Sequence, residues 1–207
     1  MLEVRYNFEG MRNSRPPRPE DRHLYAHAFG MNLFQRGLNN SRWFRLRCWL
    51  QRRGHRLLDL SELLQIYQRL GTHAIGEKTI PTNHIVGSES RSCEFDRAFN
   101  PTDDRLRERW IAIAAARYNG QALPVVDLIQ VGELYFVRDG HHRISVAHTI
   151  GQHFIEAEIV RYEVLNPPSL ATITSINRCQ AIQQESNRFG SQCRLQLFTH
   201  SPGGSYV

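Results

Sequence analysis

The sequence predicts an α+β fold, a small mixed sheet with helices, preceded by a basic helical N-terminal extension. Two observations predict it. Between residues 80 and 160, apolar runs of strand length and segments with helical periodicity follow one another as strand, helix, hairpin, helix and strand. Residues 1–60 carry twelve arginines against five acidic residues, so the excess positive charge of the chain precedes that domain.

Composition divides the 207 residues into four segments. Residues 1–22, rich in Arg, Pro and Asn, are expected to form a flexible basic arm, because they hold few apolar side chains to bury. Residues 23–79 are expected to be a helical basic extension, and residues 80–160 the α+β domain. Residues 161–207 form a C-terminal extension whose structure the sequence leaves unclear.

Several classes of protein are excluded by the composition. No run of eighteen apolar residues is present, and the N-terminus has no apolar segment of the kind found in secretory signals. The four cysteines are far apart and form no C-x-x-C pair, which argues against a zinc ribbon or a disulfide scaffold. We therefore expect a cytoplasmic protein with no membrane partner; its oligomeric state is not predicted.

The basic extension is expected to contain a helix over residues 42–53, with Ser41 as its N-cap and Gly54 at its end. Helical spacing places four apolar side chains on a stripe that we expect to pack this helix onto the protein: Trp43, Leu46, Trp49 and Leu50.

A second helix is expected over residues 60–70, because several apolar side chains share one face and Gly71 follows it. Residues 71–79 are expected to be a linker.

Turn and cap residues set the boundaries of the remaining elements. Thr102 can cap a helix that Asn119-Gly120 ends, Gly132-Glu133 is a tight turn within a hairpin, and Gly151 follows the last helix. The expected strands lie at residues 80–86, 123–131, 134–137 and 154–160, and the last helix at 142–150.

The hairpin leads into the most informative segment of the chain. Its second strand breaks at Asp139-Gly140 and passes directly into a helix whose first turn carries His141, His142 and Arg143. The N-terminus of a helix presents unpaired N–H groups and a partial positive charge. A guanidinium and two imidazoles beside those groups predict an anion site, with phosphate as the best fit.

This segment resembles the phosphate-binding box of the ParB N-terminal domain, a member of the ParB/sulfiredoxin fold family. That box is Gly-Glu-Arg-Arg, then an alanine and a glycine; here the same places hold Gly140-His141-His142-Arg143, Ala147 and Gly151. Gly120 and Pro124 match the helix end and the Pro-led strand between the family's two boxes.

An earlier ParB box has an isoleucine, an arginine and Phe-Asp, places filled here by Ile85, Arg91 and Phe95-Asp96. Its usual Asn-Pro-x-Gln-Pro lead is replaced by residues 87–90, Gly-Ser-Glu-Ser. The resemblance implies a small mixed sheet and a phosphate-binding site built from both boxes, with a nucleoside triphosphate, CTP or ATP, as the expected ligand.

The resemblance also bears on activity. The catalytic cysteine of sulfiredoxin corresponds to His141, so sulfiredoxin chemistry is not expected. A partition protein needs two further domains, and 47 residues after Val160 are too few for both. The variant Asp-Gly-His-His-Arg looks closer to ParB-like proteins outside chromosome partition, among them a free serine kinase.

Each polar residue of the box around Gly140, the second of the two along the chain, has a functional and a structural interpretation. Asp139 can hold a magnesium ion through water, or it can simply cap the helix. His141 and His142 can donate to phosphate oxygens or act as acid or base in catalysis, and either can be a solvated turn residue.

The cationic residues have the same two interpretations. Arg143 can bind two phosphate oxygens, or it can form an ion pair with Glu156 or Glu158. Arg91 is either a second phosphate clamp or a surface charge. Gly87-Ser88 can bind phosphate through backbone and hydroxyl, or it can be an ordinary loop.

Three functions follow. The first is a stand-alone ParB-like domain that binds a nucleotide or another phosphorylated ligand. The second is a magnesium-dependent phosphotransferase or nucleotide hydrolase, with Asp139 or Glu89 at the metal and His141 or His142 moving protons. The third is a nucleic-acid-binding regulator or nuclease that uses the Arg-rich front, with arginines 42, 45, 52 and 53 on phosphates and the neighbouring aromatic rings on bases.

Overall fold

The computed structural model describes residues 21–169, and every structural statement below concerns that part of the chain. The expected arm, apart from its last two residues, and the C-terminal extension beyond residue 169 lie outside the described residues. Within them the fold is α+β, as predicted, with a six-stranded mixed sheet and four α-helices. None of these helices is long and apolar enough to cross a membrane.

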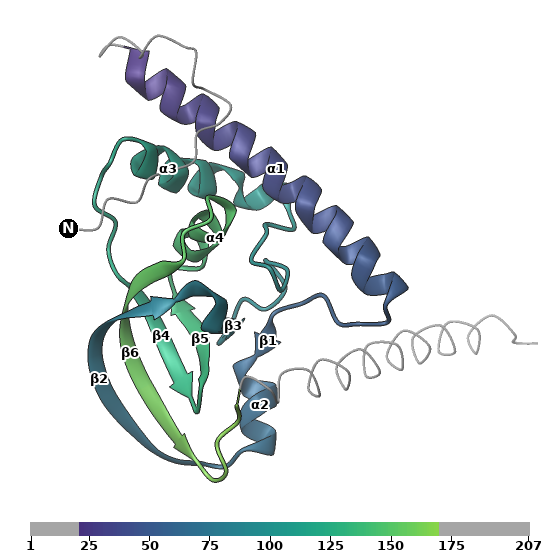
Figure 1. The fold of residues 1–207 in the computed structure, drawn as a ribbon, viewed down its shortest axis with the longest axis vertical. Helices are drawn as coiled ribbons and strands as arrows, with labels where there is room; N and C mark the ends of the chain where they lie inside the picture. Colours follow the sequence, from purple (N-terminus) through teal and green to yellow (C-terminus); the bar gives the residue numbers. More distant parts are fainter. Residues whose placement is uncertain (1–20, 170–207) are drawn as a thin grey trace, which may run out of the picture.

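The sheet has the strand order β1-β3-β5-β4-β6-β2 (Figure 1). Parallel pairs join β1 to β3, β3 to β5 and β4 to β6, while β4–β5 and β2–β6 are antiparallel. The strands are β1 (Leu58–Asp59), β2 (Arg69–Pro81), β3 (Ile85–Ser88), β4 (Val126–Val131), β5 (Leu134–Asp139) and β6 (Phe154–Val164).

Three helices are stacked on one side of this sheet, and α4 is the one that lies next to strand β4. The long helix α1 packs against α3, which in turn packs against α4 (Figure 1). Short 3₁₀ turns precede β3 and α3. The helices are α1 (Arg22–Leu50), α2 (Leu60–Ile66), α3 (Arg107–Tyr118) and α4 (His141–Thr149).

Alternation along the central strands divides the apolar core in two. Leu128 and Val137 face the cluster formed with α1, α3 and α4, whereas Ile129 and Phe136 face a second cluster that includes Leu63 of α2. All four are at most 1% exposed. Because both faces of β4 and β5 are buried, these strands read as continuous apolar runs rather than as alternating ones.

Several expected elements are confirmed. β4 and β5 form the predicted hairpin around Gly132. Asn119 ends α3, with Gly120 next at a φ of 72°, and Gly151 follows α4 at a φ of 73°. Thr102, however, is no helix cap: its hydroxyl donates to main-chain carbonyls of the preceding loop, and Asp103 caps the following 3₁₀ turn through Arg105 N.

The expectations for the extension are largely wrong. The helix predicted at 42–53 is the last part of α1, which begins twenty residues earlier at Arg22 and ends at Leu50. Ser41 is therefore not a cap; it is a buried residue inside the helix, 2% exposed. The apolar stripe does not pack on the protein either, since Trp43 and Trp49 are 71% and 67% exposed.

The predicted linker at residues 71–79 lies within β2, and the second helix ends at Ile66 rather than at residue 70. Most residues of β2 are exposed, so main-chain pairing with β6 holds the strand, and apolar periodicity could not indicate it. The strand predicted over residues 80–86 is divided by a 3₁₀ turn between the end of β2 at Pro81 and the start of β3 at Ile85.

Candidate anion-binding site

The site begins where β5 passes into α4. Gly140 is the N-cap of α4, with a φ of 96° and no side chain capping the helix. A Cβ on Gly140 would lie 2.6 Å from Val126 Cγ1, so a larger residue would meet both strain and a clash. The first intrahelical bond runs from Ile144 N to Gly140 O, which leaves the preceding amides of this turn without an intrahelical acceptor.

These amides border a small open depression of about 270 Å³, which includes the solvent at its mouth. Its lining comes from three parts of the chain: the loop after β3, one face of α3, and the start of α4. Around it lie three guanidinium groups and one carboxylate. The lining residues are Arg91, Arg109, Ile113, Asp139, Gly140, His141, His142 and Arg143.

The depression brings together the two boxes that the sequence singled out, since Arg91 comes from the first and residues 139–143 from the second. Sequence reasoning missed Arg109 and Ile113, which lie one turn apart on α3. No local signal distinguishes Arg109 from the other arginines of this segment, because its place at the site depends on how α3 docks against α4.

Arg143 is largely committed to the protein's own oxygens. Its guanidinium donates to the carbonyls of Pro124 and Val125 at 2.7 and 2.6 Å and to Asp139 Oδ2 at 2.5 Å. The expected ion pair with Glu156 or Glu158 is therefore wrong. Arg143 therefore links the segment before β4 to α4, and only part of the guanidinium's hydrogen-bonding capacity remains for a ligand.

Asp139 is the last residue of β5 and does not cap the helix, contrary to one expectation. Its side chain is 59% exposed and pairs with Arg143, whose side chain is 14% exposed. Among the described residues no group of three or more His, Cys, Asp or Glu side chains could hold a metal ion. Asp139 is the one carboxylate that lines the depression.

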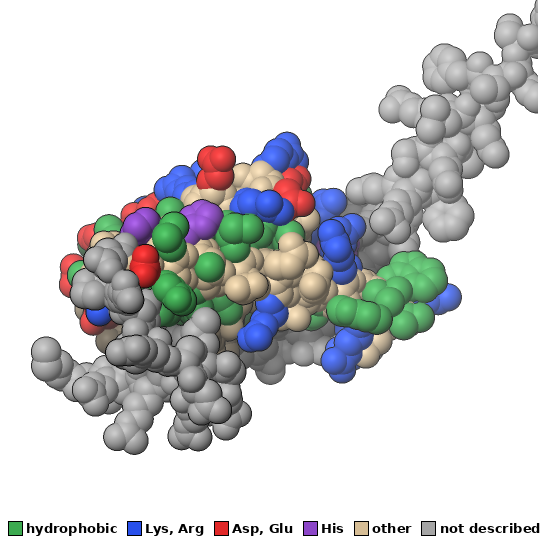
Figure 2. Space-filling view, turned by 90° about the horizontal axis from the view of Figure 1, so that it is seen from above, with side chains coloured by type: hydrophobic (Ala, Val, Ile, Leu, Met, Phe, Trp, Pro, Cys, Tyr) green, Lys and Arg blue, Asp and Glu red, His purple; other side chains and the backbone are tan. Residues whose placement is uncertain are grey.

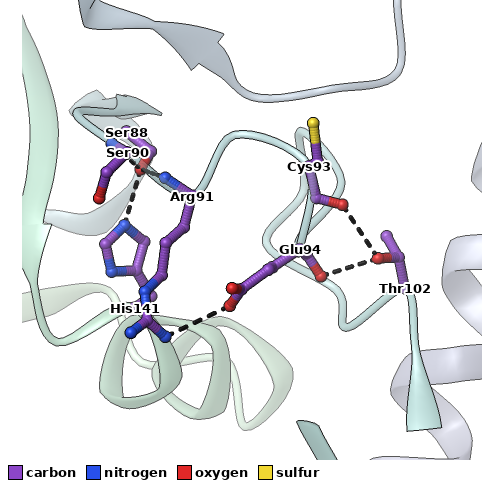
Figure 3. A network of polar contacts seen from close by, with 7 residues as sticks. All are labelled: Ser88, Ser90, Arg91, Cys93, Glu94, Thr102 and His141. Carbon is purple, nitrogen blue, oxygen red and sulfur yellow. Dashed lines mark hydrogen bonds and ion pairs between the residues drawn. The ribbon is translucent and has the colours of Figure 1, made fainter. Parts of the chain in front are cut away.

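His141 is anchored rather than free. Its Nε2 lies 2.7 Å from the hydroxyl of Ser88, which accepts hydrogen bonds from the main-chain N–H of Ser90 and Arg91 (Figure 3). Since both lone pairs of that hydroxyl are used, its proton is donated to His141 Nε2, and the proton of the ring is on Nδ1. Burial and the nearby Arg91 lower the pKa of His141 to about 4.

His142 has no such anchor. The residue is 5% exposed, and its Nδ1 is buried without a hydrogen-bond partner in the described chain. Burial, with the charges of Arg109 and Arg91, lowers the pKa of His142 to about 4, so the ring is neutral at neutral pH. A buried ring nitrogen without a hydrogen-bond partner costs free energy.

Gly87 and Ser88 lie beneath the site, not at its surface. They belong to β3 rather than to a loop, and Ser88 is fully buried. A Cβ on Gly87 would lie 2.4 Å from Leu58 O and 2.5 Å from the Phe136 ring, so this position admits only glycine. Neither residue therefore contacts a ligand directly. Gly87 allows the close packing of β3 against its neighbours, and Ser88 positions His141 through their hydrogen bond.

The loop that carries Arg91 is held at both ends. Beyond its bond to Ser88, Arg91 pairs with Glu94 at 3.4 Å, and Thr102 donates to the carbonyls of Cys93 and Glu94 (Figure 3). Between these points the fully buried Asp96 accepts from main-chain N–H groups of its own turn. A loop anchored in this way keeps the Arg91 guanidinium at the rim of the depression.

The arginines expected to contact nucleic acid lie elsewhere, on α1 and just after it, and none lines this depression. Comparisons with protein-family models, curated proteins and solved structures find no match for this chain.

Proposed function

We propose that this protein is a ParB-like domain that binds a phosphorylated ligand, such as a nucleotide, at the N-terminus of α4. The observation that carries the proposal is the set of charges around the depression, where Arg91, Arg109 and Arg143 surround one carboxylate, Asp139. Unpaired amides at the end of a helix add to that positive potential. The resemblance of both boxes to the ParB pattern supports the same ligand class.

Arg109 is the guanidinium most available to the ligand. Arg91 pairs with Glu94, and Arg143 donates to two carbonyls and Asp139. In the described chain Arg109 is exposed and makes no ion pair. In the proposed complex Arg109 holds one face of a phosphate group while the amides of residues 141–143 donate to the other.

His142 supplies a neutral hydrogen-bonding group to the same phosphate. In the tautomer with its proton on Nδ1, it donates to a phosphate oxygen and satisfies the buried nitrogen that now has no partner. His141 keeps its place through Ser88 and positions the first turn of the helix. The depression holds a phosphate group, and the remainder of a nucleotide extends beyond it toward solvent.

Magnesium fits the residues less well than phosphate does. Asp139 is the one carboxylate at the site, and its ion pair with Arg143 would have to open before it held a cation, even through water.

The test is calorimetric titration of the full chain with CTP, ATP, pyrophosphate and inorganic phosphate. The informative variant is Arg109→Gln, because Arg109 has no ion pair in the described chain whose loss would affect folding. We expect it to weaken binding of at least one of these ligands by about tenfold, the cost of one charge-assisted hydrogen bond. Arg105→Gln is the matched control, since Arg105 is exposed, pairs with Asp103 and does not line the depression.

The proposal fails if none of the four ligands binds, or if Arg109→Gln and the wild type bind all of them equally. A salt-dependent loss that is the same for Arg109→Gln and Arg105→Gln would also count against it, because it would reflect general charge rather than this site.

A phosphotransferase or nucleotide hydrolase, similar to the free serine kinase, is a second candidate. The unpartnered Nδ1 of His142, on a neutral ring that lines the depression, favours it, because such a nitrogen can accept the proton of an attacking hydroxyl. An assay of nucleotide turnover across a panel of hydroxyl acceptors tests it. Activity that survives both His142→Gln and Asp139→Asn would exclude this assignment of roles.

A further inference from the structure

The last three turns of α1 expose a ridge of large apolar side chains. Trp43 is 71% exposed, Leu46 45%, Trp49 67% and Leu50 69%. We call these four residues the α1 ridge. Figure 2 shows hydrophobic side chains gathered between Lys and Arg side chains on the right of the view, the side where α1 ends in Figure 1. Contiguous apolar surface of this kind marks an interaction site more often than a free surface.

Three residues of the α1 ridge lie opposite the side of α1 that packs on the protein, and Trp49 lies about a quarter of a turn away from them. The buried side near this end includes Gly37, Leu38, Ser41 and Cys48. Trp43, Leu46 and Leu50 have the i, i+3, i+7 spacing of one helix face, and that face points away from the buried one. The helix is thus apolar on two sides, and only one of them has a partner in the described chain.

The charge around the ridge restricts what can cover it. Residues 22–58 contain no Asp or Glu. Six arginines lie in or just after the ridge: Arg42, Arg45, Arg47, Arg52, Arg53 and Arg56. A second copy of the chain would bring two such clusters together, so self-association through this face is opposed by like charge. The partner must be anionic and must also accept apolar side chains.

An anionic lipid surface meets both conditions better than a nucleic acid does. Proteins that bind single strands use a charged groove and aromatic platforms, whereas the α1 ridge is convex and half of it is leucine, which has no aromatic face. Helices that lie on bilayers carry Trp and Leu on the inserted side and arginine beside them at the headgroups. We propose that α1 binds the surface of an anionic membrane, with the α1 ridge at the headgroup–acyl boundary.

This inference differs from the expectation that the protein has no membrane partner. That expectation rested on the absence of an apolar run long enough to span a bilayer. A helix that lies flat on the surface needs no such run, because only one of its faces enters the lipid. The proposal is also independent of the phosphate site, since no ridge residue lines that depression.

Tryptophan fluorescence provides a direct readout. The chain has three tryptophans, and Trp110 of α3 is fully buried against Phe34 of α1 and Ser145 of α4, so a change in emission reports Trp43 and Trp49. The full chain is titrated with phosphatidylcholine vesicles, with the same vesicles containing phosphatidylserine, and with a single-stranded oligonucleotide. We expect a blue shift and protection from an aqueous quencher only with phosphatidylserine, together with co-sedimentation that weakens at high salt.

Variants separate insertion from simple charge attraction. Leu46→Ser/Leu50→Ser keeps both reporter tryptophans and is expected to lower partition into the anionic vesicles by about tenfold or more. Ile66→Ser, at a 69% exposed position on α2, is the matched control and should bind as the wild type does. Arg42→Gln/Arg45→Gln should weaken binding to the anionic vesicles as well.

Three results would overturn the proposal. The first is equal partition of the wild type and Leu46→Ser/Leu50→Ser, or no partition of either. The second is a change in emission with the oligonucleotide but with neither vesicle, which would assign the face to nucleic acid. The third is a vesicle-independent dimer that Leu46→Ser/Leu50→Ser dissociates, which would assign the face to a second copy of the chain.

Discussion

The imidazole of His141 and the hydroxyl of Ser88 are joined by a buried hydrogen bond of 2.7 Å, although the two residues lie 53 positions apart. Ser88 ends β3 and His141 begins α4, so this bond fixes the start of the helix relative to the sheet. The same hydroxyl accepts the amide of Arg91 at 2.8 Å. One oxygen atom therefore links two of the three segments that line the candidate site, the loop that carries Arg91 and the start of α4 that carries Arg143.

Ser88→Ala is expected to lower the free energy of unfolding by about 1–3 kcal/mol, because it leaves His141 Nε2 and two main-chain N–H groups without their partner. Urea denaturation measures the change. Ser90→Ala is the control, since Ser90 is exposed and its hydroxyl makes no hydrogen bond within the described chain. Similar losses from the two variants would show that the hydroxyl of Ser88 has no special role.

Stability should fall as the pH falls from 6.5 toward 4. The pKa values of His141 and His142 are lowered to about 4 in the folded protein, so over this range the unfolded chain binds protons that the folded chain does not. Each histidine can then contribute a slope of at most about 1.4 kcal/mol per pH unit, and neither contributes above the unfolded pKa.

Urea unfolding at several pH values tests this dependence. His142→Gln should reduce the slope between pH 6.5 and 4, because one titrating group is lost, and should leave the pH dependence above this range unchanged. An unchanged slope in the variant would mean that His142 titrates alike in the folded and unfolded chains.

Gly140→Ala combines two costs. A residue with a Cβ at a φ of 96° is strained, and the new atom would lie 2.6 Å from Val126. We expect a loss of about 2–4 kcal/mol in the free energy of unfolding and weaker phosphate binding, as the start of α4 moves. Gly120→Ala provides the control. Gly120 has a φ of 72° and no atom within 4 Å of a Cβ, so this substitution introduces the backbone strain without the steric clash. The prediction is wrong if the two variants are equally stable.

Gly30 sets the distance between α1 and α3. A Cβ on Gly30 would lie 3.0 Å from both Cγ2 and the carbonyl oxygen of Ile111, so Gly30→Leu should force the two helices apart and cost about 2 kcal/mol or more. Asn32→Leu adds the same side chain two positions away at an exposed residue of α1 and should be nearly neutral. Thermal unfolding of both variants measures the difference, and a small effect from Gly30→Leu would show that α1 is loosely packed.

Local chemistry allowed the hairpin, α4 and the position of His141-His142-Arg143 at the start of that helix to be predicted from the sequence. Gly132, Gly140 and Gly151 occupy positions with positive φ that mark the hairpin turn and both ends of α4. Because turns and caps depend on residues close in the chain, their positions can be read without knowing the tertiary structure. The same is true of the segment His141-His142-Arg143, whose place on the first turn of α4 follows from Gly140.

The sequence-based predictions were wrong or incomplete where contacts between residues far apart in the chain determine the structure. β2 is held by its pairing with β6, a strand some eighty residues away, and most of its side chains face solvent. Arg109 joins the site through the packing of α3 on α4. Neither the pairing of β2 with β6 nor the position of Arg109 at the site can be recognised from a short segment of the sequence.

The apolar residues of α1 illustrate the difference best. The sequence by itself determined that the end of this segment is a helix with both tryptophans and arginines. It could not determine which side of the helix is buried, since both sides are apolar. The tertiary structure decided this, because Gly30 and Gly37 admit the close approach of α3 and the neighbouring loop, and that contact turns Trp43 toward solvent.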